Sequence, residues 1–308
     1  MDTIDRLLRA AKHPNLFVRG ANRLYHRRLN RRAYNTDGVD IFEEDWDCLL
    51  ILDACRYDMF KQHHDLPGQL ESRTSRGSAT VEFLRGNFFG KSLNDTVYVT
   101  ANPQFYRNRE RLPTELYDVV NIWQRDGWDE EHQTVLPETV NEYAKEAAAT
   151  YPNKRLIIHY IQPHYPFLGS EGSFDKNHLN AENPDQERLW DQLMTGELEM
   201  SRDSIWQLYV DNLLAALPYV EELMTGLTGK VVVTADHGNM VGERASPFPI
   251  TEWGHPRGMY TEQLVTVPWL TFENGPRRET VAEEPINERE DVDTDVVSER
   301  LADLGYID

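Results

Sequence analysis

Two apolar runs of the sequence end in side chains that can bind a metal ion. The run CLLIL at 48–52 is followed by Asp53, and the run VVVTA at 231–235 is followed by Asp236 and His237. In an open α/β sheet, ligands bind beyond the carboxyl ends of the strands. One terminal acid is often only a helix cap or a salt-bridge partner, but carboxylates with an adjacent imidazole suit Zn²⁺ or Mn²⁺, with Ca²⁺ or Mg²⁺ as alternatives. The sequence therefore predicts a divalent metal site, which would also relieve the repulsion between converging acids.

Two further histidines stand beside glycine or proline in predicted loops near strand ends. His164 lies in QPHYPF, after the run LIIHYI at 156–161, and His255 lies in WGHPRGMY. A single loop histidine is more often solvent-exposed than catalytic, so these two are candidates only because of the neighbouring acids. His159, inside the run, is interpreted as structural.

The segment Gly77-Ser78-Ala79-Thr80 offers candidate nucleophiles immediately before a predicted helix. A hydroxyl at a helix N-terminus meets backbone N–H groups and the positive end of the helix dipole, which suit an incoming anion. The same residue types are found at any helix N-cap. The predicted metal site favours the catalytic interpretation.

Short apolar runs alternate with helical patterns from residue 47 onward. Near-continuous apolar strands separated by helices indicate a mostly parallel central sheet with helices on both faces, an α/β fold. Within a catalytic domain at 36–308, the polar stretch 169–203 predicts a lid or small insertion. The predicted strands are 48–52, 97–100, 156–161, 231–235 and 266–272, and the predicted helices lie near 79–86, 138–149 and 204–225, with a further helical pattern in VVSERLADLGY.

The first 35 residues are predicted to form a separate basic helical arm. Residues 1–32 carry nine Lys or Arg and two Asp, about +7, which leaves about −27 on the remainder. Apolar residues recur at helical spacing with basic residues between them. Such an arm either docks peripherally on an anionic membrane surface or packs on the acidic body as an ordinary helix. The apolar positions are Ile4, Leu7, Leu8, Ala11, Phe17, Ala21, Leu24 and Tyr25, and the arginines of the second half are Arg19, Arg23, Arg27 and Arg28.

The formal charge of −20 excludes duplex nucleic acid as a general partner, because most of the surface would repel a polyanion. An acidic composition with only seven lysines suits a protein that stays hydrated in high salt, and equally an ordinary acidic cytosolic enzyme. Cys48 and Cys55 are too few for a disulfide framework and are predicted to be buried thiols. Without the apolar core of a signal peptide or a bilayer-spanning run, the predicted location is the cytoplasm, with peripheral contact to the inner membrane face as an option.

These motifs, in this order, resemble the alkaline phosphatase superfamily, specifically its sulfatase-like branch with lipoteichoic-acid synthases and phosphoethanolamine transferases. LLILDACRYD is similar to the opening strand with its metal-binding Asp, and VVVTADHGNMVGER is similar to the Asp-His-Gly metal motif. HYIQPHYPF resembles the strand whose histidine contacts the substrate anion, and WGHPRGMYTEQLVTVPWL resembles the later histidine and the last strand. The resemblance runs from about residue 46 to the C-terminal SERLADLGY.

The resemblance implies roles for these residues. Asp53, Asp236 and His237 would bind the metal, with His255 as a further ligand. His164 and His255 would hold phosphoryl or sulfuryl oxygens or protonate the leaving group.

The resemblance also ranks the hydroxyls. When GSATVEFLRGN is laid on the lipoteichoic-acid synthase pattern, Ser78 takes the place of the nucleophile, with Glu82, Phe83 and Asn87 in step and Thr80 as the fallback.

Two further residues are assigned to substrate binding, and two features depart from the family pattern. Asn102 and Arg56 are the predicted contacts, although pairing with Asp58 is the favoured role of Arg56. The sulfatase signature Cys/Ser-x-Pro-x-Arg is absent, which favours phosphate over sulfate esters. Gln162 stands where two-metal members tend to carry an Asp ligand, which favours one principal metal.

We therefore expect a metal-dependent hydrolase or transferase that acts on an anionic phosphate ester, whether monoester, diester or phospholipid headgroup, through a covalent Ser/Thr intermediate. The alternatives are a sulfatase on the same scaffold and a non-catalytic partner protein that keeps the metal site. The oligomeric state is not predicted.

Overall fold

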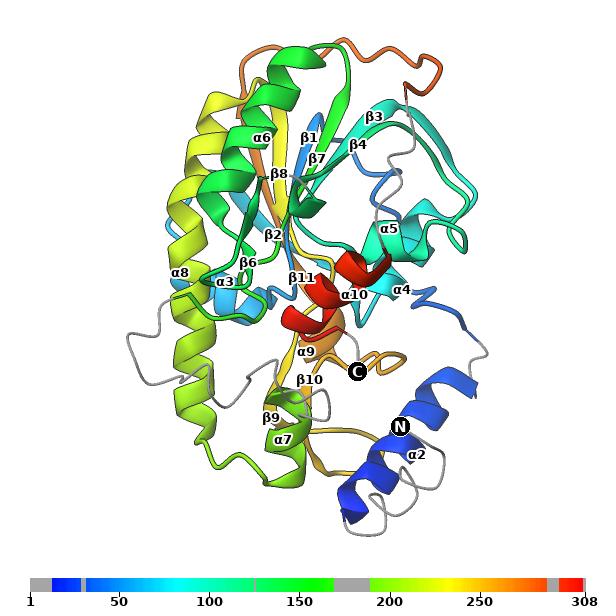
Figure 1. Cartoon of the computed structure of the whole chain (residues 1–308), viewed down its shortest axis with the longest axis vertical. Helices are drawn as coiled ribbons and strands as arrows, with labels where there is room; N and C mark the ends of the chain where they lie inside the picture. The colour runs from blue at the N-terminus through cyan, green and yellow to red at the C-terminus, as the bar shows by residue number, and fades with distance from the viewer. Residues whose placement is uncertain (1–12, 29–31, 125, 169–188, 287–293, 307–308) are drawn as a thin grey trace.

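A seven-stranded sheet forms the centre of the protein in the computed structural model, which describes residues 13–28, 32–124, 126–168, 189–286 and 294–306. Its strands are β1 (Cys48–Leu52), β2 (Gln69–Thr74), β3 (Ser92–Thr100), β4 (Glu115–Asn121), β7 (Arg155–Tyr160), β8 (Gly229–Thr234) and β11 (Thr266–Asn274). They lie in the order β2-β11-β8-β1-β7-β3-β4 (Figure 1). The strands from β8 to β4 are parallel, and β11 runs antiparallel to both of its neighbours. The predicted mostly parallel α/β sheet is confirmed.

Helices cover both faces of this sheet. The larger apolar cluster includes α3 (Tyr57–His63), α6 (Pro137–Thr150) and α8 (Arg202–Gly226), and the smaller one includes α4 (Thr80–Phe88) and α5 (Gln104–Asn108). The remaining elements are η1 (Ile122–Gln124), α7 (Leu189–Thr195), α9 (Glu262–Val265), α10 (Thr294–Asp303) and the short strand pairs β5 (Trp128–Asp129) with β6 (Thr134–Val135) and β9 (Met240–Arg244) with β10 (Thr251–Gly254).

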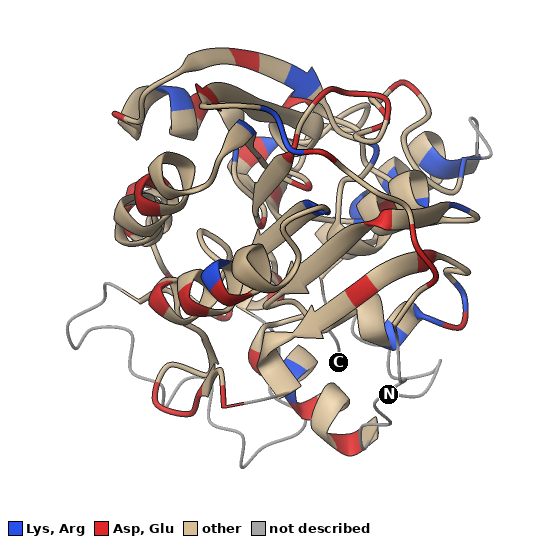
Figure 2. Cartoon of the chain, turned by 90° about the horizontal axis from the view of Figure 1, so that it is seen from above, with Lys and Arg blue, Asp and Glu red and all other residues tan. Residues whose placement is uncertain are grey.

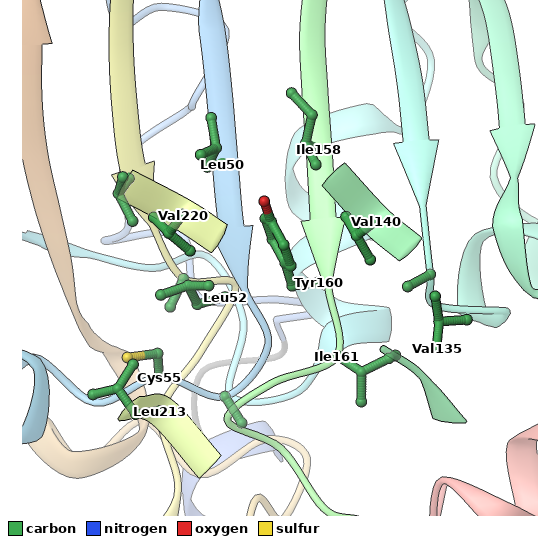
Figure 3. Packing of buried hydrophobic residues seen from close by; sticks show 14 of the residues in the cluster. Leu50, Leu52, Cys55, Val135, Val140, Ile158, Tyr160, Ile161, Leu213 and Val220 are labelled. Carbon is green, nitrogen blue, oxygen red and sulfur yellow. The ribbon is translucent and has the colours of Figure 1, made fainter. Parts of the chain in front are cut away.

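The run CLLIL shows why a strand of this sheet is apolar at every position. Successive side chains of a strand point to opposite faces. Leu50 and Leu52 lie in the larger cluster, whereas Leu49 and Ile51 lie in the smaller one. Figure 3 shows Leu50 and Leu52 packed near Ile158 and Tyr160 of β7, with Val140 of α6 and Leu213 and Val220 of α8. Because both faces are covered, no position of β1 can be polar until the strand ends at Asp53.

The predicted strands and helices are confirmed, and the missed elements include the edge strands β2 and β4 and the short helices α3 and α5. All five predicted strands and the three predicted helices occur at or within a few residues of their expected positions. The edge strand β2 was missed because its sequence, QLESRT, has no apolar run and is largely exposed. Residues 169–188 of the predicted lid lie outside the described part of the chain, and Leu189–Thr195 forms α7.

The described part of the N-terminal arm is the helix α2 (Pro14–Arg28), which lies at the periphery of the protein (Figure 1). It packs on the body through polar contacts, among them ion pairs from Arg19 to Asp191 at 2.8 Å and to Glu252 at 2.9 Å. The division into an arm at 1–35 and a domain at 36–308 stays a prediction. Among the described helices, none has the length and apolar character needed to cross a membrane.

We predict that Leu50→Ala lowers the free energy of unfolding by about 2–5 kcal/mol, because it removes a fully buried side chain from the sheet and leaves a cavity. Leu214→Ala, on the exposed side of α8, is the matched control and should change it by less than about 0.5 kcal/mol. Chemical denaturation of the two variants measures both values. Equal losses would contradict the assignment of β1 to the core.

Candidate metal centre and active site

Four polar side chains converge at the carboxyl ends of adjacent parallel strands. Asp53 follows β1, Asp236 lies just beyond β8, and Asn102 lies just beyond β3. His159 lies near the end of β7, in register with Ile51 of β1. All four polar side chains are buried. The sheet therefore brings these residues together at the edge where α/β proteins bind ligands.

Two carboxylates and an imidazole form a compact group. Ligand atoms of Asp53, His159 and Asp236 all lie within 4.8 Å of one another. Burial, together with the neighbouring Asp236 carboxylate, raises the pKa of Asp53 well above its usual range. Burial also lowers the pKa of His159 to about 4, so this ring is neutral near neutral pH and is able to act as a metal ligand.

Each carboxylate has one oxygen held by the protein and one that is not. Oδ1 of Asp236 accepts the backbone N–H groups of Ala54 at 2.9 Å and His237 at 2.8 Å. Ala54 adopts a left-handed conformation, with φ of 59°, in the turn that follows β1. Oδ2 of Asp53 accepts the hydroxyl of Tyr306. Within the described chain, Oδ2 of Asp236 and Oδ1 of Asp53 have no hydrogen-bond donor.

A backbone carbonyl fixes the proton position on His237. Its Nδ1 lies 2.7 Å from the carbonyl oxygen of Gly238, which only accepts, so Nδ1 carries the proton. In the neutral ring, Nε2 then presents a lone pair 3.3 Å from Oδ2 of Asp236 and 3.6 Å from Oδ1 of Asp53. With Nε2 unprotonated, acceptor atoms face one another, and a cation between them would be favourable.

The group fits a divalent metal ion. Ligand bonds of about 2.1 Å in tetrahedral geometry separate the ligand atoms by roughly 3.4 Å. The separations of His237 from Asp236 and Asp53, and the 3.7 Å between His159 Nε2 and Asp53 Oδ2, are close to this value. Nε2 of His159 also has no hydrogen-bond partner among the described residues, and coordination would remove this cost. Asp53, Asp236, His159 and His237 could therefore hold a metal ion.

Thr80 is the candidate hydroxyl that reaches this group. It is the first residue of α4 and is buried, with Oγ1 3.3 Å from Nε2 of His237. The N-terminus of α4 is the positive end of the helix dipole, which favours anionic oxygen at this position.

Ser78, which the resemblance ranks first as nucleophile, is engaged elsewhere. Its hydroxyl donates to Oε2 of Glu82 at 2.8 Å, lies 3.1 Å from the carbonyl oxygen of Pro256 and accepts the N–H of Gly258 at 3.0 Å. Ser78 therefore joins the start of α4 to the loop after β10, and its role as nucleophile stays a prediction.

His164 and His255 form a pair beside the metal-ligand group. Nδ1 of His164 donates to the carbonyl of Tyr165 at 2.6 Å, so the neutral ring accepts at Nε2, 2.9 Å from Nε2 of His255. Burial lowers the pKa of His164 to about 4, which favours this neutral form. The rings of His255 and His237 have centroids 4.7 Å apart. His255 can thus donate a proton near the site, while its role as a metal ligand stays a prediction.

Sequence reasoning missed two residues of the site, His159 and Tyr306. Tyr306 comes from the C-terminal segment after α10, and its ring stacks on that of His164 with centroids 4.8 Å apart and planes 12° apart. Its hydroxyl accepts from Nδ2 of Asn102 at 2.9 Å and donates to Asp53. The signal for Tyr306 was the family-like tail SERLADLGY, to which no chemical role had been assigned.

The two predicted substrate contacts are bonded to protein groups instead. Nδ2 of Asn102 donates to Oδ2 of Asp53 at 2.6 Å, so Asn102 orients a candidate metal ligand. Arg56 is bonded bidentately to Asp58 at 2.8 and 2.5 Å and to Glu243 at 2.6 Å, and it does not contact the metal-ligand group. The favoured pairing of Arg56 with Asp58 is confirmed, and substrate binding by either residue stays a prediction.

Comparisons with known proteins find similarity in structure alone. No family model matches the sequence, and no match is found among curated proteins. The chain is similar to the integral membrane lipooligosaccharide phosphoethanolamine transferase A from Neisseria meningitidis, with 12% identity and a TM-score of 0.43. The match covers 72% of this chain and 47% of the transferase, so the chain spans about half the length of that protein.

Two other solved structures are similar at the same level. The C-terminal periplasmic domain of EcEptC from Escherichia coli, in complex with Zn, has 13% identity and a TM-score of 0.45, covering 75% of this chain and 74% of that domain. A protein in the alkaline phosphatase superfamily from Vibrio parahaemolyticus has 12% identity and a TM-score of 0.42, covering 82% of this chain and 63% of that one. These similarities concern the fold alone.

We predict that Asp236→Asn abolishes stoichiometric metal binding while the fold is retained, because it removes one of two negative charges and places an amide at the site. Elemental analysis of the purified variant measures bound metal, and circular dichroism checks the fold. Asp58→Asn is the matched control, since Asp58 lies outside the group. Full metal content in Asp236→Asn would exclude this site.

We predict that Tyr306→Phe lowers metal affinity by about 10–100-fold, because it removes a hydrogen bond that orients the Asp53 carboxylate. Competition with a chromogenic chelator measures the affinity. Tyr165→Phe removes a nearby hydroxyl that has no contact with Asp53 or Asp236 within the described chain, and it should leave the affinity unchanged. Unchanged affinity in Tyr306→Phe would reduce the tyrosine to a packing role.

Proposed function

We propose that the protein is a metal-dependent enzyme that cleaves or transfers phosphate esters, with Thr80 as the nucleophile. The observation that carries the proposal is the position of Thr80 at the first turn of α4, with Oγ1 3.3 Å from His237 Nε2. This residue joins a nucleophilic oxygen, a helix N-terminus and a cation site. Those three features are the parts that phosphoryl transfer through a covalent intermediate needs.

The reaction proceeds in two displacements. In the first, Oγ1 of Thr80 bonds to phosphorus, the bond from phosphorus to the leaving oxygen breaks, and the proton released by Thr80 passes through the His164–His255 pair to that oxygen. In the second, water or an acceptor alcohol attacks phosphorus, the bond to Oγ1 breaks, and the proton released by the attacking oxygen passes through the pair to Oγ1.

The ligand set favours Zn²⁺ or Mn²⁺. Two carboxylates and two imidazoles suit these ions better than the all-oxygen sites that Ca²⁺ and Mg²⁺ prefer. When bound, such an ion would lower the pKa of the Thr80 hydroxyl and attract an anionic ester. Tyr306 and Asn102 hold the Asp53 carboxylate in place for it.

Phosphate esters are proposed rather than sulfate esters because the sequence lacks the signature that precedes formylglycine. A sulfatase on the same scaffold is the alternative substrate class. A panel of aryl phosphate monoesters, aryl phosphate diesters and aryl sulfates, assayed with Zn²⁺ and Mn²⁺, separates these possibilities. Bound metal without turnover on any of these esters would favour a non-catalytic partner protein.

We predict that Thr80→Ala retains the metal and loses turnover by at least about 10³-fold, because the nucleophile is removed while the ligands remain. Ser78→Ala is the matched control. It should retain turnover within about tenfold and lose about 1–3 kcal/mol of stability, since it leaves buried hydrogen-bonding groups unpaired. Mass spectrometry of the acid-quenched enzyme should locate the phosphoryl group on Thr80. The reverse pattern of activity would assign the reaction to Ser78.

A further inference from the structure

Helix α2 contacts the body mainly through polar side chains, with Leu16 packed against the larger apolar cluster. Asn22 is fully buried and makes two reciprocal bonds with the backbone of Phe248, at 2.9 Å and 2.8 Å. Arg19, with a side chain only 13% exposed, pairs with Asp191 and with the fully buried Glu252. These contacts fix which side of the helix faces inward.

The opposite side of α2 is apolar and exposed. Phe17, Leu24 and Tyr25 are 54%, 50% and 46% exposed, and their spacing of seven and eight residues places them on one face. A surface helix of a globular protein normally does the reverse, burying its apolar stripe and exposing its charges. We call these three residues the outer face of α2.

The outer face is too small for a stable dimer. At roughly 200 Å² per large side chain, about half of it exposed, the three residues offer roughly 300 Å², or roughly 600 Å² from two copies. Stable protein interfaces bury about 1,200–2,000 Å² in total. A few apolar side chains on one face of a helix are, in contrast, sufficient for shallow insertion between lipid headgroups.

The distribution of charge selects an anionic surface. Residues 1–32 carry about +7, whereas the remainder carries about −27. Asp and Glu are spread over the helices and connecting segments in Figure 2. An anionic lipid surface would repel the acidic body and attract the N-terminal segment. Because Arg19 and Arg27 are paired with acids of the body, this attraction comes from the other basic residues of 1–32.

We propose that α2 is a docking helix that lies on an anionic lipid surface, with Phe17, Leu24 and Tyr25 inserted among the headgroups. The same helix contacts both segments that carry the proposed catalytic groups. Arg27 bonds to Glu82 of α4 at 3.2 Å, and Arg23 donates to the carbonyl of Arg257, near His255, at 3.3 Å. Docking would therefore hold the Thr80 end of the protein toward the lipid, a consequence that rests on the proposed function, whereas docking itself does not.

Vesicle co-sedimentation of the full chain tests the proposal. Wild-type protein should bind vesicles of phosphatidylcholine mixed with phosphatidylglycerol and should not bind phosphatidylcholine alone. The double variant Phe17→Ser/Leu24→Ser should bind the mixed vesicles at least tenfold more weakly. Leu214→Ser, which removes a 44% exposed leucine from α8, is the matched control and should bind as the wild type does.

Three outcomes would overturn docking: no binding of wild-type protein to the mixed vesicles, equal binding by the double variant, or a dimer in light scattering that the double variant loses while vesicle binding is absent. The last result would assign the outer face to a second copy of the chain. Thr80→Ala should bind vesicles normally, so a failure of docking and a failure of the proposed reaction are distinguishable. Thermal unfolding midpoints of all variants confirm that each is folded.

Discussion

The burial of Asp53 and Asp236 within 4.8 Å of each other is the constraint on which the rest of the site depends. At an effective dielectric constant of 20, two charges at that separation repel by about 3 kcal/mol, before the cost of removing each from water is counted. Hydrogen bonds from Ala54, His237, Asn102 and Tyr306 offset part of this cost on one oxygen of each acid. The other oxygens face imidazole Nε2 atoms and have no hydrogen-bond donor within the described chain. A cation between them would complete the arrangement.

The elements that position the site residues differ in how firmly the sheet holds them. The acids and His159 stand at the ends of β1, β7 and β8, whose parallel pairing is continuous up to the site. Thr80 and His255 come from a helix N-terminus and a loop, which strand pairing does not hold. Ser78 joins these two segments through Glu82, Pro256 and Gly258. The hydroxyl that the family pattern suggests as nucleophile is thus placed to fix the relative position of the proposed nucleophile, Thr80, and the proposed proton donor, His255.

The sequence predicted the parts of the fold that are buried on both sides. The strands CLLIL and VVVTA could be predicted because each of their residues packs in one of two apolar layers. The acidic residues that follow the strands stand out from these apolar runs. His159 was interpreted as structural because a polar residue inside such a run resembles a core residue with its hydrogen bond satisfied, and its place in the metal-ligand group is a candidate role. The alternation of side chains along a strand would have located His159. Its side chain lies on the same face of β7 as Ile157, which is the face of the sheet where α4 begins. Tyr306 reaches Asp53 across 253 positions of sequence, a contact that no local pattern encodes.

Helix α2 shows a different limit of sequence analysis. The amphipathic pattern defines a polar face and an apolar face of the helix, but it does not predict which face packs on the body of the protein. Here the buried carboxylate of Glu252 determines the orientation of α2, because burying it without its partner Arg19 would cost about 3–5 kcal/mol. The outward turn of Phe17, Leu24 and Tyr25 leaves roughly 300 Å² of apolar surface in water, about 7 kcal/mol of unused transfer free energy at 25 cal/mol per Å². The apolar term is the larger of the two, so the packing of α2 on the body must draw on further contacts, among them those of Asn22 with Phe248. Both faces of α2 are favourably placed when the body binds the charged face and an apolar environment covers the outer face.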